Sequence, residues 1–426
     1  MRSPLQVAVV GAGWAGLAAA VRLVEAGHRV ALYETSATAG GRARSVTAQE
    51  QVLDNGQHIL IGAYTRTLAL MRSVGADPNV LLQRLPLTLR YPDGRGLSVP
   101  AGPASMAFAR AVWGCRGWGW RDRLSLLRTT AAWARSGFRC DPALTVAELC
   151  RGLTAPVREL LIDPLCVAAL NTPSSAASGQ VLLRVLHDAL FSGPGSADLL
   201  LPRVLLGDVL PAPALRWLQA HGADVRLGRR VKQLQPEGAA WRINGERADR
   251  VVLACPATEG ARLTAAIAPD WSARAAAFDY EPIVTVYLDA PGARLPSAMT
   301  ALVESPTHPA QFAFDHGALG ATPGRFAFVV SGARRWVDRG LEATGAAVLH
   351  QAATSFTPGT WPAPPTLLRV LAEKRATFRC VPGLDRPTAT IAPGLVAAGD
   401  YVEGPYPATL EAAVRAGEAA ALRVSA

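Results

Sequence analysis

The pattern of apolar and polar positions at the start of the chain predicts a strand, a helix and a second strand in close succession. Residues 5–10 form an apolar run, residues 17–26 are rich in alanine and stop at Gly27, and residues 28–33 form a second apolar run that ends at Glu34. Short apolar runs are typical of buried strands, and a longer alanine-rich stretch stopped by glycine is typical of a helix. The sequence therefore predicts an α/β fold that opens with a βαβ unit.

Further along, the pattern changes several times. From about 65 to 200 it is mostly helical, from 204 to 265 it mixes helix with strand, and from 266 to 375 short β-rich runs appear. The tail has an apolar run at 395–398 and a helical stretch at 408–422. We expect two lobes, since a single core stops growing near ~250–300 residues. One lobe is predicted from residues 1–65, 204–265 and 376–426, and the other from the insertions 66–203 and 266–375.

Composition narrows the class of protein. The chain has 426 residues, 50% of them apolar, and a formal net charge of +10 supplied almost entirely by arginine. A basic surface is typical of proteins that meet nucleic acid, anionic membranes or acidic substrates, but a bias towards alanine and arginine explains it as well. No nucleic-acid recognition module is evident, so we expect no nucleic-acid partner. The six cysteines are scattered without a C-x-x-C pair, which argues against a metal site. Neither a signal peptide nor a membrane span is predicted, and a reducing cytoplasmic setting follows.

The turn after the first strand has the glycine spacing of a dinucleotide-binding site. The first glycine permits a tight turn, the second lets phosphate approach the backbone, and the third lets helix and strand pack closely. The acidic residue that ends the second strand is placed to bind ribose hydroxyls and would repel the 2′-phosphate of NADP. The predicted contacts with the nucleotide are therefore Gly11, Ala12, Gly13, Ala15, Gly16 and Glu34.

Two further segments favour FAD over NAD. Gly40-Gly41-Arg42 follows Glu34 closely, and its arginine offers a fork of donors to phosphate. In the tail, Gly399-Asp400 follows a strand and precedes a helix that begins near Ala408-Thr409. The N–H groups of that helix can stabilise negative charge on a reduced isoalloxazine, and Asp400 suits a ribityl hydroxyl.

These residues together resemble the flavin amine oxidase/phytoene desaturase superfamily. The resemblance is carried by the glycine turn, Glu34, Gly40-Gly41-Arg42, Val231, the run 251–256 and Ala398-Gly399-Asp400. It implies a Rossmann-like FAD-binding domain of the amine oxidase type with an inserted α+β substrate domain, in which Val231 meets the adenine through its backbone.

Four segments resemble, more narrowly, the hydroxysqualene dehydroxylases: 54–64, 164–173, 373–378 and 407–411. That resemblance implies the reduction of hydroxysqualene to squalene for hopanoid or related triterpene synthesis, with a hydride from reduced flavin N5 quenching an allylic cation. A carotenoid-type desaturase and an amine oxidase are the alternatives. No aromatic cage is obvious, although Tyr401 and Tyr406 keep amine oxidation open. A non-catalytic carrier of prenyl lipids would need eroded FAD motifs. Since the chain has no second nucleotide site or iron–sulfur spacing, we expect an external electron donor.

The superfamily places the segment 54–58 beside the isoalloxazine, which implies that Gly56 and Gln57 contact the flavin. Hydroxide is a poor leaving group and needs a proton or a hydrogen-bond donor as it departs. His58 is the first candidate for this acid, because histidine protonates near neutral pH; a packing role is the alternative. Gln57 and Asn171 are the other catalytic candidates, and for Asn171 the alternative is a helix cap.

A C30 substrate implies contact with a membrane. Tryptophan favours the headgroup boundary and arginine attracts anionic lipid. Both are interleaved in the stretch 108–138, which we expect to lie against the inner face of the cytoplasmic membrane, with an ordinary core helix as the alternative. The residues concerned are Trp113, Trp118, Trp120 and Trp133 with Arg110, Arg116, Arg121, Arg123, Arg128 and Arg135.

Overall fold

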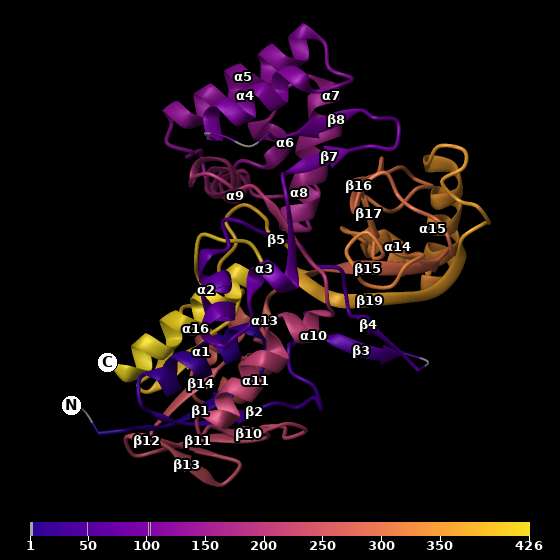
Figure 1. The fold of residues 1–426 in the computed structure, drawn as a ribbon. Coiled ribbons are helices and arrows are strands. Elements are labelled where there is room, and N and C mark those ends of the chain that lie inside the picture. The colour runs from indigo at the N-terminus through magenta and orange to yellow at the C-terminus, as the bar shows by residue number, and fades with distance from the viewer. Residues whose placement is uncertain (1–2, 49, 101, 103) are drawn as a thin grey trace.

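A six-stranded sheet forms the centre of one lobe in the computed structural model, which describes residues 3–48, 50–100, 102 and 104–426 (Figure 1). The strands lie in the order β10-β2-β1-β14-β21-β20, and all neighbours are parallel except β20 and β21. They are β1 (Gln6–Val10), β2 (Arg29–Tyr33), β10 (Asp224–Arg226), β14 (Arg250–Leu253), β20 (Thr390–Ala392) and β21 (Leu395–Ala397). Three distant stretches of sequence thus build one sheet, in the α/β class that was predicted.

Two layers cover this sheet. On one face lie α1 (Trp14–Glu25), α11 (Pro211–Ala220) and α16 (Leu410–Ser425). Small residues let α1 and α16 approach closely, since a Cβ at Gly417 would lie 2.1 Å from the carbonyl oxygen of Ala15. The other face packs against an antiparallel sheet through Trp241 and Ile243. Its strands are β11 (Leu234–Glu237), β12 (Ala240–Ile243) and β13 (Glu246–Ala248).

A second sheet of five antiparallel strands forms another layer, in the order β16-β17-β18-β15-β19. Side chains of its strands belong to two separate hydrophobic cores. On β15, Val284, Val286 and Leu288 pack in the core that contains α15, whereas Tyr287 packs in the core that contains the helical region. The elements are β15 (Tyr280–Asp289), β16 (Met299–Ala301), β17 (Phe312–Asp315), β18 (Arg325–Val330), β19 (Thr366–Phe378), α14 (Arg334–Arg339) and α15 (Leu341–Ser355).

A helical region projects at the top of Figure 1, where α4 and α5 lie side by side. Its helices are α4 (Ala104–Gly114), α5 (Trp120–Arg135), α6 (Val146–Leu149), α7 (Ala155–Val157), the π-helix 158–162, α8 (Asp163–Leu170) and α9 (Gly179–Phe191). The other elements are β3 (Ser45–Ala48), β4 (Gln51–Asp54), β5 (Leu60–Ile61), α2 (Thr65–Ser73), α3 (Pro78–Leu81), β6 (Leu82–Leu85), β7 (Thr88–Arg90), β8 (Gly96–Ser98), β9 (Leu199–Pro202), α10 (Leu206–Val209), α12 (Ala257–Thr264) and α13 (Pro269–Ala276).

The structure agrees with one prediction of local structure and refines another. The stretch 65–200 is mostly helical, as expected, but it also contains β6, β7, β8 and the first half of β9. β6 pairs with β9, far along the chain, whereas β7 and β8 form a local hairpin. Short leucine-rich runs do not distinguish strand from helix. The helix predicted from residue 17 begins at Trp14, directly after the glycine turn.

Candidate active site

The turn after β1 is so tight that two of its positions have no room for a side chain. A Cβ at Gly11, whose φ is +106°, would lie 2.6 Å from the carbonyl oxygen of Ala254. A Cβ at Gly16 would lie 1.8 Å from the carbonyl oxygen of Gly11. These two glycines therefore fix the turn and let α1 start directly against the sheet.

Gly13 is different, because the space beside it is open. The nearest atom to a Cβ at Gly13 would be the Cα of Gly41, at 3.8 Å. The first turn of α1 has neither a side-chain cap nor an acidic residue. Its free N–H groups and the positive end of the helix dipole therefore suit a pyrophosphate beside Gly13.

The Glu34 carboxylate is held at the edge of this turn. Its Oε2 accepts a hydrogen bond from the backbone N–H of Ala12 at 2.7 Å, and its Oε1 accepts one from Ser36 at 2.8 Å. Ala12 and Ala15 are both buried, so they contribute backbone and packing rather than exposed side chains. Glu34 directly follows the last residue of β2. An acidic residue at this position can accept hydrogen bonds from the hydroxyls of a ribose.

Arg42 joins the second glycine loop to the tail of the chain. Its Nη2 donates to Oδ2 of Asp400 at 2.6 Å, and its Nη1 donates to the carbonyl oxygen of Ala376 at 2.6 Å. The loop itself bonds to the first turn, since the N–H of Gly40 donates to the carbonyl oxygen of Ala12 at 2.8 Å. Gly41 has a left-handed φ of +61° and faces Gly13.

The start of α16 is already capped within the protein. Oγ1 of Thr409 accepts from the N–H of Ala412 at 3.2 Å. The buried Glu411 in the first turn is directed to α2, where its carboxylate accepts from Arg66 and Thr67. The positive helix end predicted at Ala408-Thr409 is therefore partly neutralised by Glu411.

Val231 follows β10 and precedes β11 in the chain, and its side chain is buried in the core. Its carbonyl oxygen accepts from Nη2 of Arg262 at 2.9 Å. Arg262 also donates to Glu259 at 2.8 Å, so this peptide is held firmly in place.

The loop that follows β4 packs against the second sheet. The hydroxyl of Tyr287 donates to the carbonyl oxygen of Asp54 at 2.9 Å. Oδ1 of Asp54 accepts from Ser45 at 3.0 Å and from the N–H of Leu206 at 2.9 Å, which braces the loop. Gln57 meets the turn that follows β17, with its Oε1 at 3.3 Å from Nε2 of His316.

His58 is turned back onto its own loop. Its Nδ1 lies 2.9 Å from the carbonyl oxygen of Gly56, so Nδ1 must carry the proton in that hydrogen bond. Burial and, to a lesser degree, the charge of Arg42 lower the pKa of His58 below its ordinary value, against the opposing hydrogen bond to Gly56. The neutral imidazole at pH 7 thus has a free lone pair on Nε2 and donates from there only when it is protonated.

Asn171 is buried and all of its side-chain groups are used. It ends α8 with a left-handed φ of +47°. Its Nδ2 donates to the carbonyl oxygen of Glu281 and to Oγ1 of Thr377, both at 3.0 Å, and its Oδ1 accepts from the N–H of Gly332 at 2.7 Å. These bonds tie the end of α8 to β15 and β19. Asn171 thus ends a helix and braces it against the second sheet.

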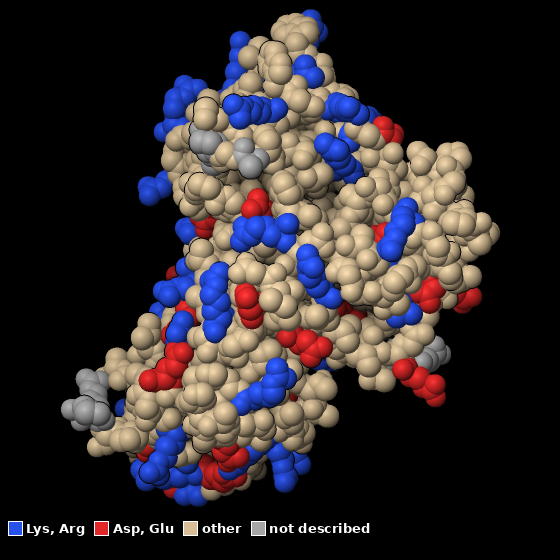
Figure 2. Space-filling view, in the orientation of Figure 1, with Lys and Arg blue, Asp and Glu red and all other residues tan. Residues whose placement is uncertain are grey.

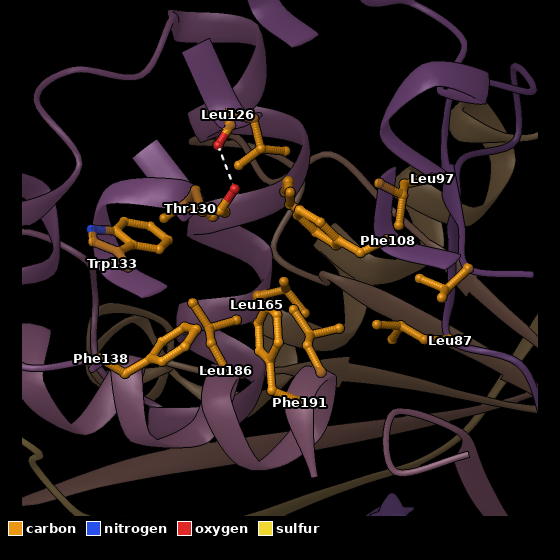
Figure 3. A pocket seen from close by; sticks show the side chains of 14 residues that line it. Leu87, Leu97, Phe108, Leu126, Thr130, Trp133, Phe138, Leu165, Leu186 and Phe191 are labelled. Carbon is orange, nitrogen blue, oxygen red and sulfur yellow. Dashed lines mark hydrogen bonds between the residues drawn. The ribbon is translucent and has the colours of Figure 1, made fainter. Parts of the chain in front are cut away.

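An entirely apolar cavity lies in the helical region, between α4 and α5 on one side and α8 and α9 on the other (Figure 3). The hydroxyl of Thr130 is bonded to the carbonyl oxygen of Leu126, so even this residue presents carbon to the cavity. The cavity volume is about 30 Å³, enough for a small group but not for a C30 chain. Among its lining residues are Leu87, Phe108, Trp133, Phe138, Leu165 and Phe191.

Taken together, the glycine turn, the uncapped α1, Glu34 and the Arg42–Asp400 pair fit FAD. The model of the family of flavin-containing amine oxidoreductases matches residues 14–425. The chain belongs to this family. It is an FAD-dependent oxidoreductase, and the predicted superfamily and fold are confirmed.

The proteins that resemble this chain differ in how far the likeness extends. A hydroxysqualene dehydroxylase from Rhodopseudomonas palustris is 28% identical over 97% of this chain and 97% of its own. A probable zeta-carotene desaturase from Synechococcus elongatus is 28% identical, but over 54% of this chain and 51% of its own. The solved structure of an oxidoreductase from Methanosarcina mazei shares the fold, with a TM-score of 0.75 at 17% identity over 97% of this chain and 99% of that chain.

The two tyrosines that kept amine oxidation open have other partners. Tyr401 is buried with its ring edge-to-face with Phe278, at 6.2 Å. The ring of Tyr406 is covered by the guanidinium groups of Arg184 at 4.8 Å and Arg415 at 5.4 Å. A cage for a substrate ammonium needs aromatic faces open to the ligand. The cations of the protein itself take that position at Tyr406.

Sequence reasoning missed the residues that hold these segments from a distance. His316 supports Gln57, Tyr287 supports Asp54, and Arg386 bonds to the loop after Asp400. Each stands alone in the sequence beside ordinary strand or loop residues, and no motif marks it. Their roles can be recognised only in the folded structure, where the second sheet and the tail lie against the glycine loops.

Proposed function

We propose that this enzyme reduces the C30 alcohol hydroxysqualene to squalene. The observation that carries the proposal is the extent of the likeness: it covers nearly the whole of both chains for a hydroxysqualene dehydroxylase and about half for a desaturase. The apolar cavity with no polar lining adds support, because a hydrocarbon chain needs such a surface.

The proposed reaction replaces a C–O bond by a C–H bond. Reduced FAD, when bound, supplies the hydride, and the hydroxyl leaves with a proton as water. The substrate carbon gains two electrons and the flavin loses two, which an external donor must return. The protein must hold the substrate, donate to the departing oxygen and keep water away from the reacting carbon.

Gln57 and His58 are the residues we propose beside the departing hydroxyl. Because Oε1 of Gln57 faces Nε2 of His316, we propose that its amide N–H groups are directed to a ligand. His58 would donate from Nε2 only as the imidazolium, which its lowered pKa disfavours at neutral pH. We therefore propose Gln57 as the standing hydrogen-bond donor, and His58 as the acid when protonated.

We propose the apolar cavity as one end of the isoprenoid site. Since its volume is about 30 Å³, binding must move α4 and α5 away from α9. The cavity lies directly behind the surface that these two helices present, so the same movement would open a path for the substrate.

The outer surface of α4 and α5 is the face we propose for peripheral membrane contact. Trp113 and Trp120 are 68% and 67% exposed, and Met106 is 52% exposed. Trp118 and Trp133 are buried and belong to the core, so we restrict the proposal to the exposed residues of the stretch. Figure 2 shows basic side chains around this end of the molecule. Each arginine near an anionic bilayer contributes about 1 kcal/mol.

Charge and ring placement favour an anionic lipid surface as the partner. The stretch 104–139 contains a single acidic residue, Asp122, among its arginines. Arg121 lies over Trp120 at 5.4 Å, and Arg123 lies over Trp113 at 5.6 Å, which pairs a cation with each exposed ring. Among the helices that the structure describes, none is both long and apolar enough to cross a bilayer.

Co-sedimentation with vesicles tests the membrane proposal. We expect the wild type to bind phosphatidylcholine vesicles containing anionic lipid, and the double substitution Trp113→Ser with Trp120→Ser to weaken binding about tenfold, the equivalent of ~1.4 kcal/mol. Leu422→Ser is the matched control, because Leu422 is 74% exposed on the other lobe. Equal loss in the control and the double variant, or no binding by the wild type, would contradict the proposal.

A substrate panel tests the proposed reaction. FAD-loaded protein is incubated with hydroxysqualene, a carotenoid precursor or a primary amine, each with a chemical reductant and separately with an artificial electron acceptor. We expect turnover of hydroxysqualene alone, and only with the reductant. Conversion of the carotenoid precursor with the acceptor would favour the desaturase, and oxidation of the amine would favour an amine oxidase.

A further inference from the structure

The loop that carries Asp400 is wound around one guanidinium group. Arg386 donates to the carbonyl oxygens of five loop residues, and these bonds converge on its guanidinium group. The acceptors are Asp400 at 2.5 Å, Gly404 at 2.9 Å, Tyr406 at 2.8 Å, Tyr401 at 3.3 Å, and Val402.

Arg386 donates its hydrogen bonds to carbonyl oxygens rather than to a carboxylate. Within the described part of the chain, its hydrogen bonds all go to backbone oxygens, and its guanidinium lies over the ring of Phe378 at 4.9 Å. Burial lowers its pKa, although the nearby Asp400 opposes this. A guanidinium suits such a place because its planar fork has five N–H donors.

Arg386 supplies the donors that these loop carbonyls need. Carbonyl oxygens that point at one place repel each other and lose solvent, and each costs free energy when it is left without a donor. The first of them belongs to Asp400, whose side chain accepts from Arg42 of the second glycine loop at 2.6 Å. The last precedes Pro407 and the start of α16. The loop geometry thus sets where Asp400 and α16 lie relative to the glycine loops.

We propose that Arg386 is a positioning residue of the FAD site, which holds residues 400–406 so that the Asp400 carboxylate is directed to Arg42 and the cofactor. A lysine in its place would keep the charge, but three donors on a single nitrogen cannot serve five carbonyl oxygens. The effect depends on the arrangement of donors more than on the charge. The inference concerns FAD binding and does not depend on the identity of the substrate.

Two variants and one control test this proposal. Arg386→Gln removes the charge and most donors, Arg386→Lys keeps the charge, and Arg274→Gln removes a half-exposed guanidinium that is paired with Asp385 at 3.5 Å. For each deflavinated protein we would measure the dissociation constant of FAD by fluorescence, the visible circular dichroism of the bound flavin, and hydrogen exchange of peptides that cover 399–409 and β15.

We expect both Arg386 variants to raise the dissociation constant at least about tenfold, to change the flavin dichroism and to exchange faster in 399–409 while β15 is unchanged. The control should resemble the wild type. Unchanged affinity and dichroism in Arg386→Gln would overturn the proposal. Faster exchange throughout the chain, β15 included, would also overturn it, because Arg386 would then support the whole fold rather than this loop. Full restoration by Arg386→Lys would assign the effect to charge and contradict the positioning role.

Discussion

Replacing Gly13 by alanine should separate cofactor binding from folding. The backbone at Gly13 has a φ of −70°, which alanine adopts without strain, and the new methyl group would meet no protein atom closer than 3.8 Å. The apoprotein should therefore change in stability by less than about 1 kcal/mol. The same methyl group would stand where the pyrophosphate approaches the first turn of α1.

The cost to FAD binding can be worked from the contacts that the methyl group displaces. A hydrogen bond from a backbone N–H to a charged phosphate contributes about 1.5–3 kcal/mol. Loss of one such bond amounts to about 1.5–3 kcal/mol, or about 10- to 150-fold in the dissociation constant. Gly16→Ala offers a contrast, because its Cβ would lie 1.8 Å from the carbonyl oxygen of Gly11. That variant should fail in folding as well as in binding.

The assay compares urea unfolding of the deflavinated proteins with FAD titration followed by flavin fluorescence. Deflavinated Gly13→Ala should unfold at the same urea concentration as the deflavinated wild type, and it should bind FAD weakly. Wild-type affinity in Gly13→Ala would refute the placement of the pyrophosphate beside this residue. Destabilisation by several kcal/mol would refute the claim that the space is open.

Two further predictions concern pH. Burial raises the pKa of Asp54 to about 6, against its hydrogen bonds to Leu206 and Ser45. The folded state therefore binds this proton more tightly than the unfolded chain, and the free energy of unfolding loses up to about 3 kcal/mol from this group as pH rises from about 4 to 6. Asp54→Asn keeps an acceptor for the N–H of Leu206. Its free energy of unfolding in urea should vary less with pH across that window than that of the wild type, and parallel curves of the two proteins would contradict this. Because the pKa of His58 is lowered by burial, an acid role predicts that kcat rises as pH falls below about 6.5 and that His58→Gln loses this limb; a wild-type profile without the limb would exclude the role.

The parts of the site that lie close together in sequence could be predicted from it. The spacing of Gly11, Gly13 and Gly16 specifies a turn and a helix start, because a tight turn requires glycine at set positions whatever the rest of the fold does. The end of the second strand likewise fixes Glu34. These features depend only on the conformation of neighbouring residues, which the local sequence specifies.

The remaining features depend on how the chain folds back on itself. His316, which directly follows β17, reaches Gln57 across 259 positions of sequence. Arg386 bonds to carbonyl oxygens only 14 to 20 positions ahead, but no motif marks the loop that brings them together. Asn171 lies in a segment that resembles a family motif, but the sequence does not show what it binds. Its three partners lie on β15, on β19 and in the loop at Gly332. No periodicity encodes such pairings, since each residue type is as common in positions with no partner of this kind.

The direction of electron flow is the most direct test of the proposed function. The protein is made anaerobic, its FAD is photoreduced, and hydroxysqualene is added while the flavin absorbance is followed and the products are extracted. We predict reoxidation of the flavin with one squalene formed for each flavin. A flavin that stays reduced with hydroxysqualene, while a saturated isoprenoid or an amine bleaches the oxidised form, would contradict reductive dehydroxylation and assign the enzyme to oxidation.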